Sequence, residues 1–420
     1  MIKQTSNQMV TRYNHPTNAL QRFALFFFLI CMMSPEMPGQ TLKAKTATIP
    51  FILDHNRMLV EAEFQRADGS WRKALLWVDT GNPNFFISYE LAVDLGLKID
   101  TTTSEQKFSP PHARMGGMPV DFCGVRFQVA PFEPWLFNTM HNDGNLPSTV
   151  LQKYHVIFDY PARKFTIAEP GALKPLGASS PVTISKYTGI IQMDAVIGGE
   201  KYSFAFDNGA SFSFVPDDLV SRWHQLHPDW PTAAGATGYA NIWGMWPGEG
   251  SFEMIRIPEF TWGGFEIRDG MVCGLPPVFR GKTGLREFYS RKTVRPVDGF
   301  LGPNVFKNYR IEIVYNDSMI YFEKGQEPET DDMNIVPLTL KPLNDGSYKV
   351  IGVLGPDQKP VIKGIEFGDI LVGIGHLKTQ GTTMGTVIGA LRGKPGEYRK
   401  LILEHDGKRF TVKATVTRVL

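Results

Sequence analysis

Two aspartates in this chain each follow an apolar run and each precede a glycine by two positions. Asp79 begins the tripeptide Asp-Thr-Gly after the apolar residues 74–78, and Asp207 begins Asp-Asn-Gly after residues 202–206. An apolar run of this length predicts a buried strand, and the glycine lets the chain turn tightly after it. If the two turns face each other, the carboxylates come into contact and cannot both ionise. Such a pair shares a proton and acts as an acid and a base at once.

The sequence around the two aspartates is repeated. Residues 61–78 and 190–206 each predict a hairpin that leads into one of the aspartates. Short helices are expected after both turns, at 88–95 and 216–223. Further along, the pattern Asp-Gly-x-Leu occurs at 143–146 and again at 298–301. A repeat of this kind indicates an internal duplication with two diverged halves.

This arrangement resembles the retropepsin-like and pepsin-like aspartic proteases in their single-chain, two-lobed form, over about residues 47–324. The apolar-Asp-x-Gly turns and the segment Gly-Phe-Leu-Gly at 299–302 carry most of the resemblance. It implies a mainly β fold with two pseudo-symmetric lobes, at residues 41–175 and 176–330. It also implies an aspartic endopeptidase that cleaves a peptide or protein substrate and requires neither a metal nor an organic cofactor.

The resemblance assigns roles to six residues. Asp79 and Asp207 would form the catalytic pair. The Thr80 hydroxyl would tie the two catalytic loops together, and amides in the loops would bond to the carboxylates. The four residues expected to support the catalytic loops are Thr80, Gly81, Asn208 and Gly209.

Three departures from the family pattern leave a second interpretation open. Asn208 replaces the hydroxyl residue of the second turn; its amide can still hydrogen-bond, but it is bulkier. The pair Asn82-Pro83 replaces two small residues, and Pro147 stands where the first lobe would carry a glycine. The alternative is a catalytically inactive relative that binds peptides or serves as a scaffold.

Residues 335–420 resemble a bacterial PDZ domain, with a Gly-Asp-Ile-Leu segment and a strand, helix and hairpin in that order. Such domains bind an extended peptide as an added strand. The groove would lie between the strand at 348–354 and the helix at 383–392, with the loop at 344–347 near the peptide carboxylate. The residues expected to contact the peptide are Val350, Ile351, Val387 and Leu391. The alternative is a domain that only packs on the lobes.

Residues 1–40 resemble a signal peptide or a membrane anchor. Arg22 precedes an apolar run at 23–33, which is short for a membrane span. The sequence therefore predicts a periplasmic or secreted protein, anchored to the membrane if the segment is retained or if Cys31 is lipidated. The remaining cysteines, Cys123 and Cys273, are too few for a disulfide framework and are expected to be free thiols.

A net charge of +2 in 420 residues argues against a dedicated nucleic-acid-binding protein. His224 and His227 have metal-ligand spacing, but the sequence places no completing ligand nearby, so no metal site is expected. Two glycine-rich stretches, at 108–118 and 235–250, are expected to form the flaps of the two lobes or ordinary surface loops.

Overall fold

The computed structural model describes residues 44–100, 102–103, 110–129, 140–235, 252–275, 285–327, 329, 331–354 and 362–420. The N-terminal segment at 1–40 and almost all of the glycine-rich stretch at 235–250 lie outside these residues. Within the described part of the chain, no helix is long and apolar enough to cross a membrane.

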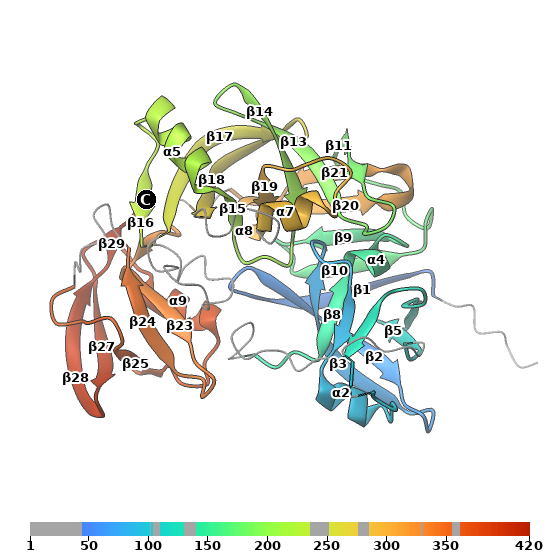
Figure 1. The fold of residues 1–420 in the computed structure, drawn as a ribbon, viewed down its shortest axis with the longest axis horizontal. Coiled ribbons are helices and arrows are strands. Elements are labelled where there is room, and N and C mark those ends of the chain that lie inside the picture. Colours follow the sequence, from blue (N-terminus) through green and yellow to red (C-terminus); the bar gives the residue numbers. More distant parts are fainter. Residues whose placement is uncertain are drawn as a thin grey trace, which may run out of the picture. The chain divides into compact units, whose positions relative to one another are not determined.

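The fold is mainly β, as the sequence predicts (Figure 1). The first half of the chain contains β1 (Thr46–Asp54), β2 (Arg57–Gln65), β3 (Trp71–Asp79), β4 (Phe85–Ile87), α2 (Tyr89–Asp94), β5 (Ala113–Met115), β6 (Met118–Val120), β7 (Phe127–Val129), β8 (Gly144–Pro147), α4 (Ser148–Leu151), β9 (His155–Asp159) and β10 (Lys164–Ala168). The helix expected near residue 88 is α2, which begins where the Ser88 side chain accepts a hydrogen bond from the Leu91 amide and caps the first turn.

The second half repeats this succession of elements. It contains β11 (Ala178–Pro181), β12 (Thr183–Ile184), β13 (Ile191–Ile197), β14 (Glu200–Phe206), β15 (Ser213–Pro216), α5 (Asp217–Leu226), β16 (Thr232–Ala234), β17 (Glu253–Trp262), β18 (Phe265–Leu275), α7 (Leu285–Ser290), β19 (Gly299–Leu301), α8 (Pro303–Phe306), β20 (Tyr309–Val314), a 3-10 helix (Tyr315–Asp317) and β21 (Met319–Lys324). The helix expected at 216–223 is α5.

The two halves place equivalent strands around each aspartate. β3, which ends at Asp79, runs parallel to β8, and β14, which leads into Asp207, runs parallel to β19. β4 and β15 each begin six residues after an aspartate and pair antiparallel with β8 and β19 respectively. The Asp143 carboxylate accepts a hydrogen bond from the Leu75 amide, and the Asp298 carboxylate accepts one from the Ser203 amide. Leu75 and Ser203 lie four residues before the two aspartates, so the repeated sequence corresponds to a repeated structure.

The two halves are joined through one sheet. β9 and β20 pair antiparallel, which places them side by side in the order β11-β21-β20-β9-β10-β1 (Figure 1). At this junction the buried Glu312 carboxylate accepts hydrogen bonds from His155, at 2.6 Å, and from Arg310, at 2.7 Å. Because the sheet is continuous, the lobes expected at 41–175 and 176–330 each contribute strands to one common sheet.

The last part of the chain forms a separate sheet with one helix. Its elements are β22 (Asn334–Ile335), β23 (Leu338–Pro342), β24 (Tyr348–Val353), β25 (Ile370–Ile374), β26 (Leu377–Lys378), α9 (Met384–Leu391), β27 (Tyr398–His405), β28 (Lys408–Thr415) and β29 (Thr417–Arg418). The strand order is β23-β24-β25-β27-β28, and β26 pairs with β25. We call residues 331–420 the C-terminal module.

The C-terminal module is packed onto the second half of the chain. Leu338 and Leu340 of β23 belong to the same buried apolar cluster as Phe212 and Phe214, which follow the second aspartate. A buried ion pair joins Arg256 of β17 to Asp332 at 2.7 Å.

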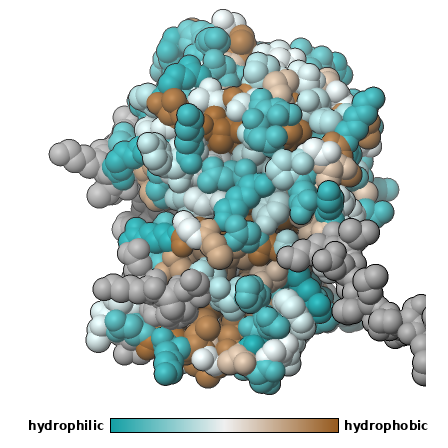
Figure 2. Space-filling model, turned by 90° about the vertical axis from the view of Figure 1, so that its right-hand side faces the viewer, coloured by the Kyte–Doolittle hydropathy of each residue, from teal (hydrophilic) through white to brown (hydrophobic). Residues whose placement is uncertain are grey.

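On the face shown in Figure 2, hydrophilic residues are interspersed with smaller groups of hydrophobic ones. That mixture is typical of a surface exposed to water.

Candidate active site

Each aspartate lies at the end of a buried strand, with its carboxylate held by the turn that follows. The Gly81 amide donates to Asp79 Oδ1 at 3.1 Å. The Gly209 and Ala210 amides donate to Asp207 Oδ1 at 2.9 and 3.2 Å. Both aspartates are nearly inaccessible, with 3% and 4% of their surface exposed. The turns therefore fix one oxygen of each carboxylate and point both side chains inward.

The structure brings the two predicted aspartates together. A Cβ atom built on Gly81 would lie 2.4 Å from Asp207 Cγ, and one built on Gly209 would lie 2.4 Å from Asp79 Oδ1. Each carboxylate thus packs against the glycine of the opposite turn. Any side chain at either glycine would collide with a carboxylate, which is why these two positions require glycine.

Reciprocal hydrogen bonds join the two turns. The backbone amide of Asn208 donates to Thr80 Oγ1 at 2.9 Å, and the backbone amide of Thr80 donates to Asn208 Oδ1 at 2.9 Å. The Thr80 hydroxyl also donates to the Phe206 carbonyl at 3.2 Å. Asn208 accepts the hydrogen bond from the Thr80 amide through its side-chain carbonyl, as a hydroxyl would. The departure at position 208 therefore preserves the connection between the turns.

The remaining amide group of Asn208 faces Tyr160. Among the described residues, neither Asn208 Nδ2 nor the Tyr160 hydroxyl makes a hydrogen bond of regular geometry. Burial raises the pKa of Tyr160, and the nearby Asn208 amide opposes that rise. The asparagine therefore retains the connection between the turns but adds a buried donor that is poorly satisfied.

The electrostatics of the pair favour a single shared proton. Burial and the charge of Asp207 hold the pKa of Asp79 well above its usual range. Burial also raises the pKa of Asp207, but hydrogen bonds from Tyr289 and from backbone amides oppose the rise. The three donors on Asp207, from Tyr289, Gly209 and Ala210, favour its ionised form. Nothing in the sequence indicated the tyrosine donor.

The other two sequence departures have simple structural explanations. The Asn82 side chain hydrogen-bonds to Asp79 and lowers its pKa slightly against the effect of burial. Pro147 ends β8 opposite Asp79 and precedes α4. In the second half, a Cβ at Gly302 would lie 2.8 Å from the Phe212 carbonyl. Glycine is thus required in one half, whereas the other accommodates proline.

Two residues that the sequence analysis did not single out lie at the pair. The Tyr289 hydroxyl, at the end of α7, donates a short hydrogen bond to Asp207 Oδ2. The Lys292 ammonium interacts with the charges of Asp79 and Asp207, although burial lowers the pKa of Lys292 to about 8. Tyr289 and Lys292 precede the Gly-Phe-Leu-Gly segment by ten and seven residues respectively. Their position depends on how α7 packs, for which the sequence carries no short-range signal.

The glycine-rich stretch at 108–118 does not form a flap over the pair. Its described residues belong to the β5–β6 hairpin, which pairs with β2. A Cβ at the Gly116 turn would lie 3.0 Å from Ile49 and 3.1 Å from Ala47, so the tip packs on β1. Met115 and Met118 are buried in the core of the first half. This hairpin is therefore anchored by its own apolar side chains.

The C-terminal module differs from the expected groove geometry. β24, which carries Val350 and Ile351, lies between β23 and β25, so the strands at the two edges of the sheet are β23 and β28. Val350, Val387 and Leu391 are fully buried in the core, whereas Ile351 is partly buried. The sequence could not distinguish the edge strand β23 from β24 because both strands have similar apolar alternation.

The loop expected to receive a peptide carboxylate is a closed turn. Asp345 Oδ1 accepts hydrogen bonds from the Ser347 amide and hydroxyl, at 2.9 and 2.6 Å. The Gly346 amide donates to the Leu343 carbonyl. The amides of Gly346 and Ser347 are thus engaged in the β23–β24 turn, and the carboxylate-binding role of the loop at 344–347 stays a prediction.

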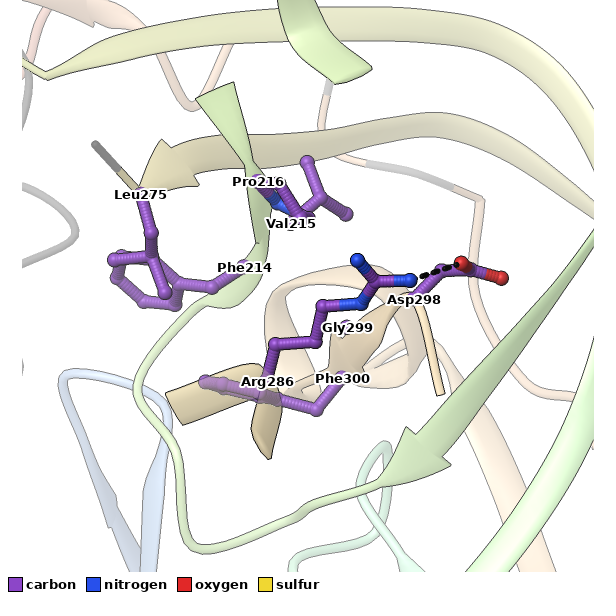
Figure 3. Close-up of a pocket in the computed structure, with 8 residues that line it drawn as sticks. All are labelled: Phe214, Val215, Pro216, Leu275, Arg286, Asp298, Gly299 and Phe300. Atoms are coloured by element: carbon purple, nitrogen blue, oxygen red, sulfur yellow. Dashed lines mark hydrogen bonds and ion pairs between the residues drawn. The ribbon is translucent and has the colours of Figure 1, made fainter. Parts of the chain in front are cut away.

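A small cavity lies between β15, β19 and α7 (Figure 3). Phe214, Leu275 and Phe300 line its apolar part, and Arg286 forms an ion pair with Asp298 at 3.3 Å at its edge. Its internal volume of about 10 Å³ has room for about one water molecule. The cavity is too small to hold a substrate side chain in this state.

Comparisons with known proteins give little beyond the geometry. No family model and no curated protein matches the chain. Among solved structures, the chain is similar to the aspartic proteinase from Irpex lacteus, with a TM-score of 0.38 and 12% identity, covering 68% of this chain and 99% of that one. A TM-score this low carries no weight for the chemistry, so the candidate site is defined by its own geometry: two buried carboxylates, each held by its own turn and packed on the opposite glycine.

Proposed function

We propose that this protein is an aspartic endopeptidase in which Asp79 and Asp207 activate a water molecule. The observation that carries the proposal is the reciprocal bonding of Thr80 and Asn208, which holds the two carboxylates against each other's turns. Two buried carboxyl groups in contact share one proton, which supplies an acid and a base in one site.

The reaction follows from that shared proton. A water between the carboxyl groups attacks the carbonyl carbon of the peptide bond, and its proton passes to the ionised Asp207. The proton on Asp79 passes to the carbonyl oxygen, which gives a neutral tetrahedral diol. Asp207 then gives its proton to the amide nitrogen, a diol hydroxyl gives its proton to Asp79 as the C–N bond breaks, and the pair regains its starting state.

The proposal is tested by removing each carboxyl group in the full chain. Asp79→Asn and Asp207→Asn each lower the cleavage rate of an unfolded protein substrate by about 1,000-fold or more, because the two residues act as a unit. Asp218→Asn, at an exposed position in α5, is the matched control and keeps its activity. A pepstatin-type inhibitor blocks the wild-type protein. Activity that survives either active-site substitution would assign hydrolysis to another site.

An inactive peptide-binding protein is the second candidate. Tyr289 favours it, because its hydroxyl occupies an oxygen of Asp207 that hydrolysis requires. If the purified wild-type protein cleaves no substrate but binds unfolded chains, this second function replaces the first.

The roles of the remaining segments are also proposals. The C-terminal module would act as a PDZ-like domain that recruits substrate or partner peptides by strand addition, and β23 is one of the two edge strands of its sheet. The N-terminal segment would direct the protein out of the cytoplasm or anchor it to the membrane.

A further inference from the structure

Residues 286–297, which we call the α7 segment, cover the aspartate pair with two side chains. Tyr289 donates to Asp207 Oδ2, while the other oxygen of Asp207 already accepts two backbone amides. Lys292 lies close enough to Asp79 for their charges to interact. The α7 segment thus places a hydroxyl on Asp207 and a positive charge near Asp79.

The Tyr289 ring is held by packing and is 6% exposed. It packs against Phe300 in a tilted arrangement with ring centroids 4.7 Å apart and meets Phe288 edge-on at 5.4 Å. The Thr293 amide and hydroxyl both donate to the Tyr289 carbonyl. The side chain therefore has a fixed direction, and its hydroxyl is presented to the carboxylate.

Hydrogen bonds that do not involve Asp79 or Asp207 hold the α7 segment in place. Arg286 binds the Val297 carbonyl at 3.0 Å and Asp298 at 3.3 Å. The Thr188 hydroxyl donates to the Lys292 carbonyl at 2.6 Å. These bonds hold the backbone without involving a carboxylate of the pair, so a change in the tyrosine side chain leaves them in place.

We propose that the α7 segment closes the active site at rest: the Tyr289 hydroxyl occupies the Asp207 oxygen that the attacking water needs, and a peptide must displace it before hydrolysis. This inference rests on the proposed function. Burial and both carboxylates hold the pKa of Tyr289 well above its usual range. The neutral hydroxyl is therefore a donor that blocks Asp207, and it is poorly suited to carry protons.

The effect of such a closed state on kinetics is distinctive. If only a fraction of the molecules is open, the apparent affinity for any ligand of the cleft is reduced by that fraction. Tyr289→Phe removes the hydroxyl and keeps the ring packed against Phe300. We expect it to lower KM for a peptide substrate and Ki for a pepstatin-type inhibitor by the same factor, about tenfold or more, with kcat unchanged.

One control variant and one further test variant accompany Tyr289→Phe. Tyr309→Phe removes another mostly buried tyrosine hydroxyl, which donates to the Glu266 carbonyl, and leaves KM and Ki unchanged. Lys292→Gln lowers KM and Ki in the same direction as Tyr289→Phe, by a smaller factor.

The outcomes separate the two proposals. If the wild type is active and Tyr289→Phe loses kcat, or leaves KM and Ki at wild-type values, the closed resting state is wrong and the proposed protease function stands. If neither wild type nor Tyr289→Phe cleaves a substrate, the protease function fails and the closed state fails with it.

Discussion

At the scale of single residues, the site shows how one asparagine takes the place of a hydroxyl. The side-chain carbonyl of Asn208 accepts a hydrogen bond from the backbone amide of Thr80, and the backbone amide of Asn208 donates one to the Thr80 hydroxyl. The connection between the turns therefore depends on an acceptor at position 208 and not on a hydroxyl as such. What the asparagine adds is a second polar group, Nδ2, in a buried place.

Replacement of this asparagine tests its role. Asn208→Thr supplies a hydroxyl acceptor and removes the poorly satisfied amide, so we expect a gain of about 1 kcal/mol in the free energy of unfolding with activity retained. Asn208→Ala removes the acceptor and should lose about 1–3 kcal/mol. Urea denaturation at constant pH measures both. A threonine variant less stable than the alanine variant would contradict this account.

The raised pKa of Asp79 predicts how stability depends on pH. A carboxyl group whose pKa is higher in the folded state stabilises the fold below its unfolded pKa and loses that contribution as pH rises through the folded value. Asp79→Asn should therefore increase the free energy of unfolding at pH 7. The difference from wild type should shrink as pH falls to about 4, the usual pKa of an aspartate.

At the scale of elements, the strands next to the aspartates were predictable and the distant contacts were not. The hairpins into Asp79 and Asp207, and the helix capped by Ser88, follow from local apolar alternation and capping. α7 is different, because Tyr289 reaches Asp207 only when its ring packs on Phe300 from β19. A contact set by packing between separate elements leaves no periodic trace in the sequence.

The pairing of β9 with β20 suggests a prediction for the junction of the two halves. Although burial raises it, the pKa of Glu312 is held below its usual value by hydrogen bonds from His155 and Arg310. Glu312→Leu leaves the buried His155 without this partner and removes the carboxylate nearest to the partly exposed Arg310, so it should lower the free energy of unfolding by about 3–5 kcal/mol. Glu323→Gln, an exposed carboxylate 3.8 Å from Arg310, should cost under about 0.5 kcal/mol. Equal losses in thermal melts would show that the junction does not depend on Glu312.

At the scale of the whole molecule, the C-terminal module is part of the packed core. Leu338 and Leu340 share an apolar cluster with Phe212 and Phe214, and the Thr339 hydroxyl bonds to the Gly235 carbonyl. The module therefore packs on the second half of the chain, and its recruitment of peptides stays a prediction.

The Arg256–Asp332 ion pair tests this packing. Arg256→Met leaves the Asp332 carboxylate buried beside an apolar side chain, so we expect a loss of about 3–5 kcal/mol. Arg256→Met combined with Asp332→Leu should recover most of it, because two apolar groups can replace a buried pair. Differential scanning calorimetry of the full chain compares the three proteins. A double variant as unstable as the single one would show that the charges themselves hold the module.

The reciprocal bonds between Thr80 and Asn208 also bear on how such a chain can evolve. Two copies that began alike have become complementary, one supplying a hydroxyl and the other an amide. A copy of the second turn in the first position would set two asparagines against each other, with an extra buried amide and without the hydroxyl that now bonds to Phe206. Position 208 can therefore exchange asparagine for threonine while position 80 keeps its hydroxyl, so we expect position 80 to vary less than position 208 among descendants of this sequence.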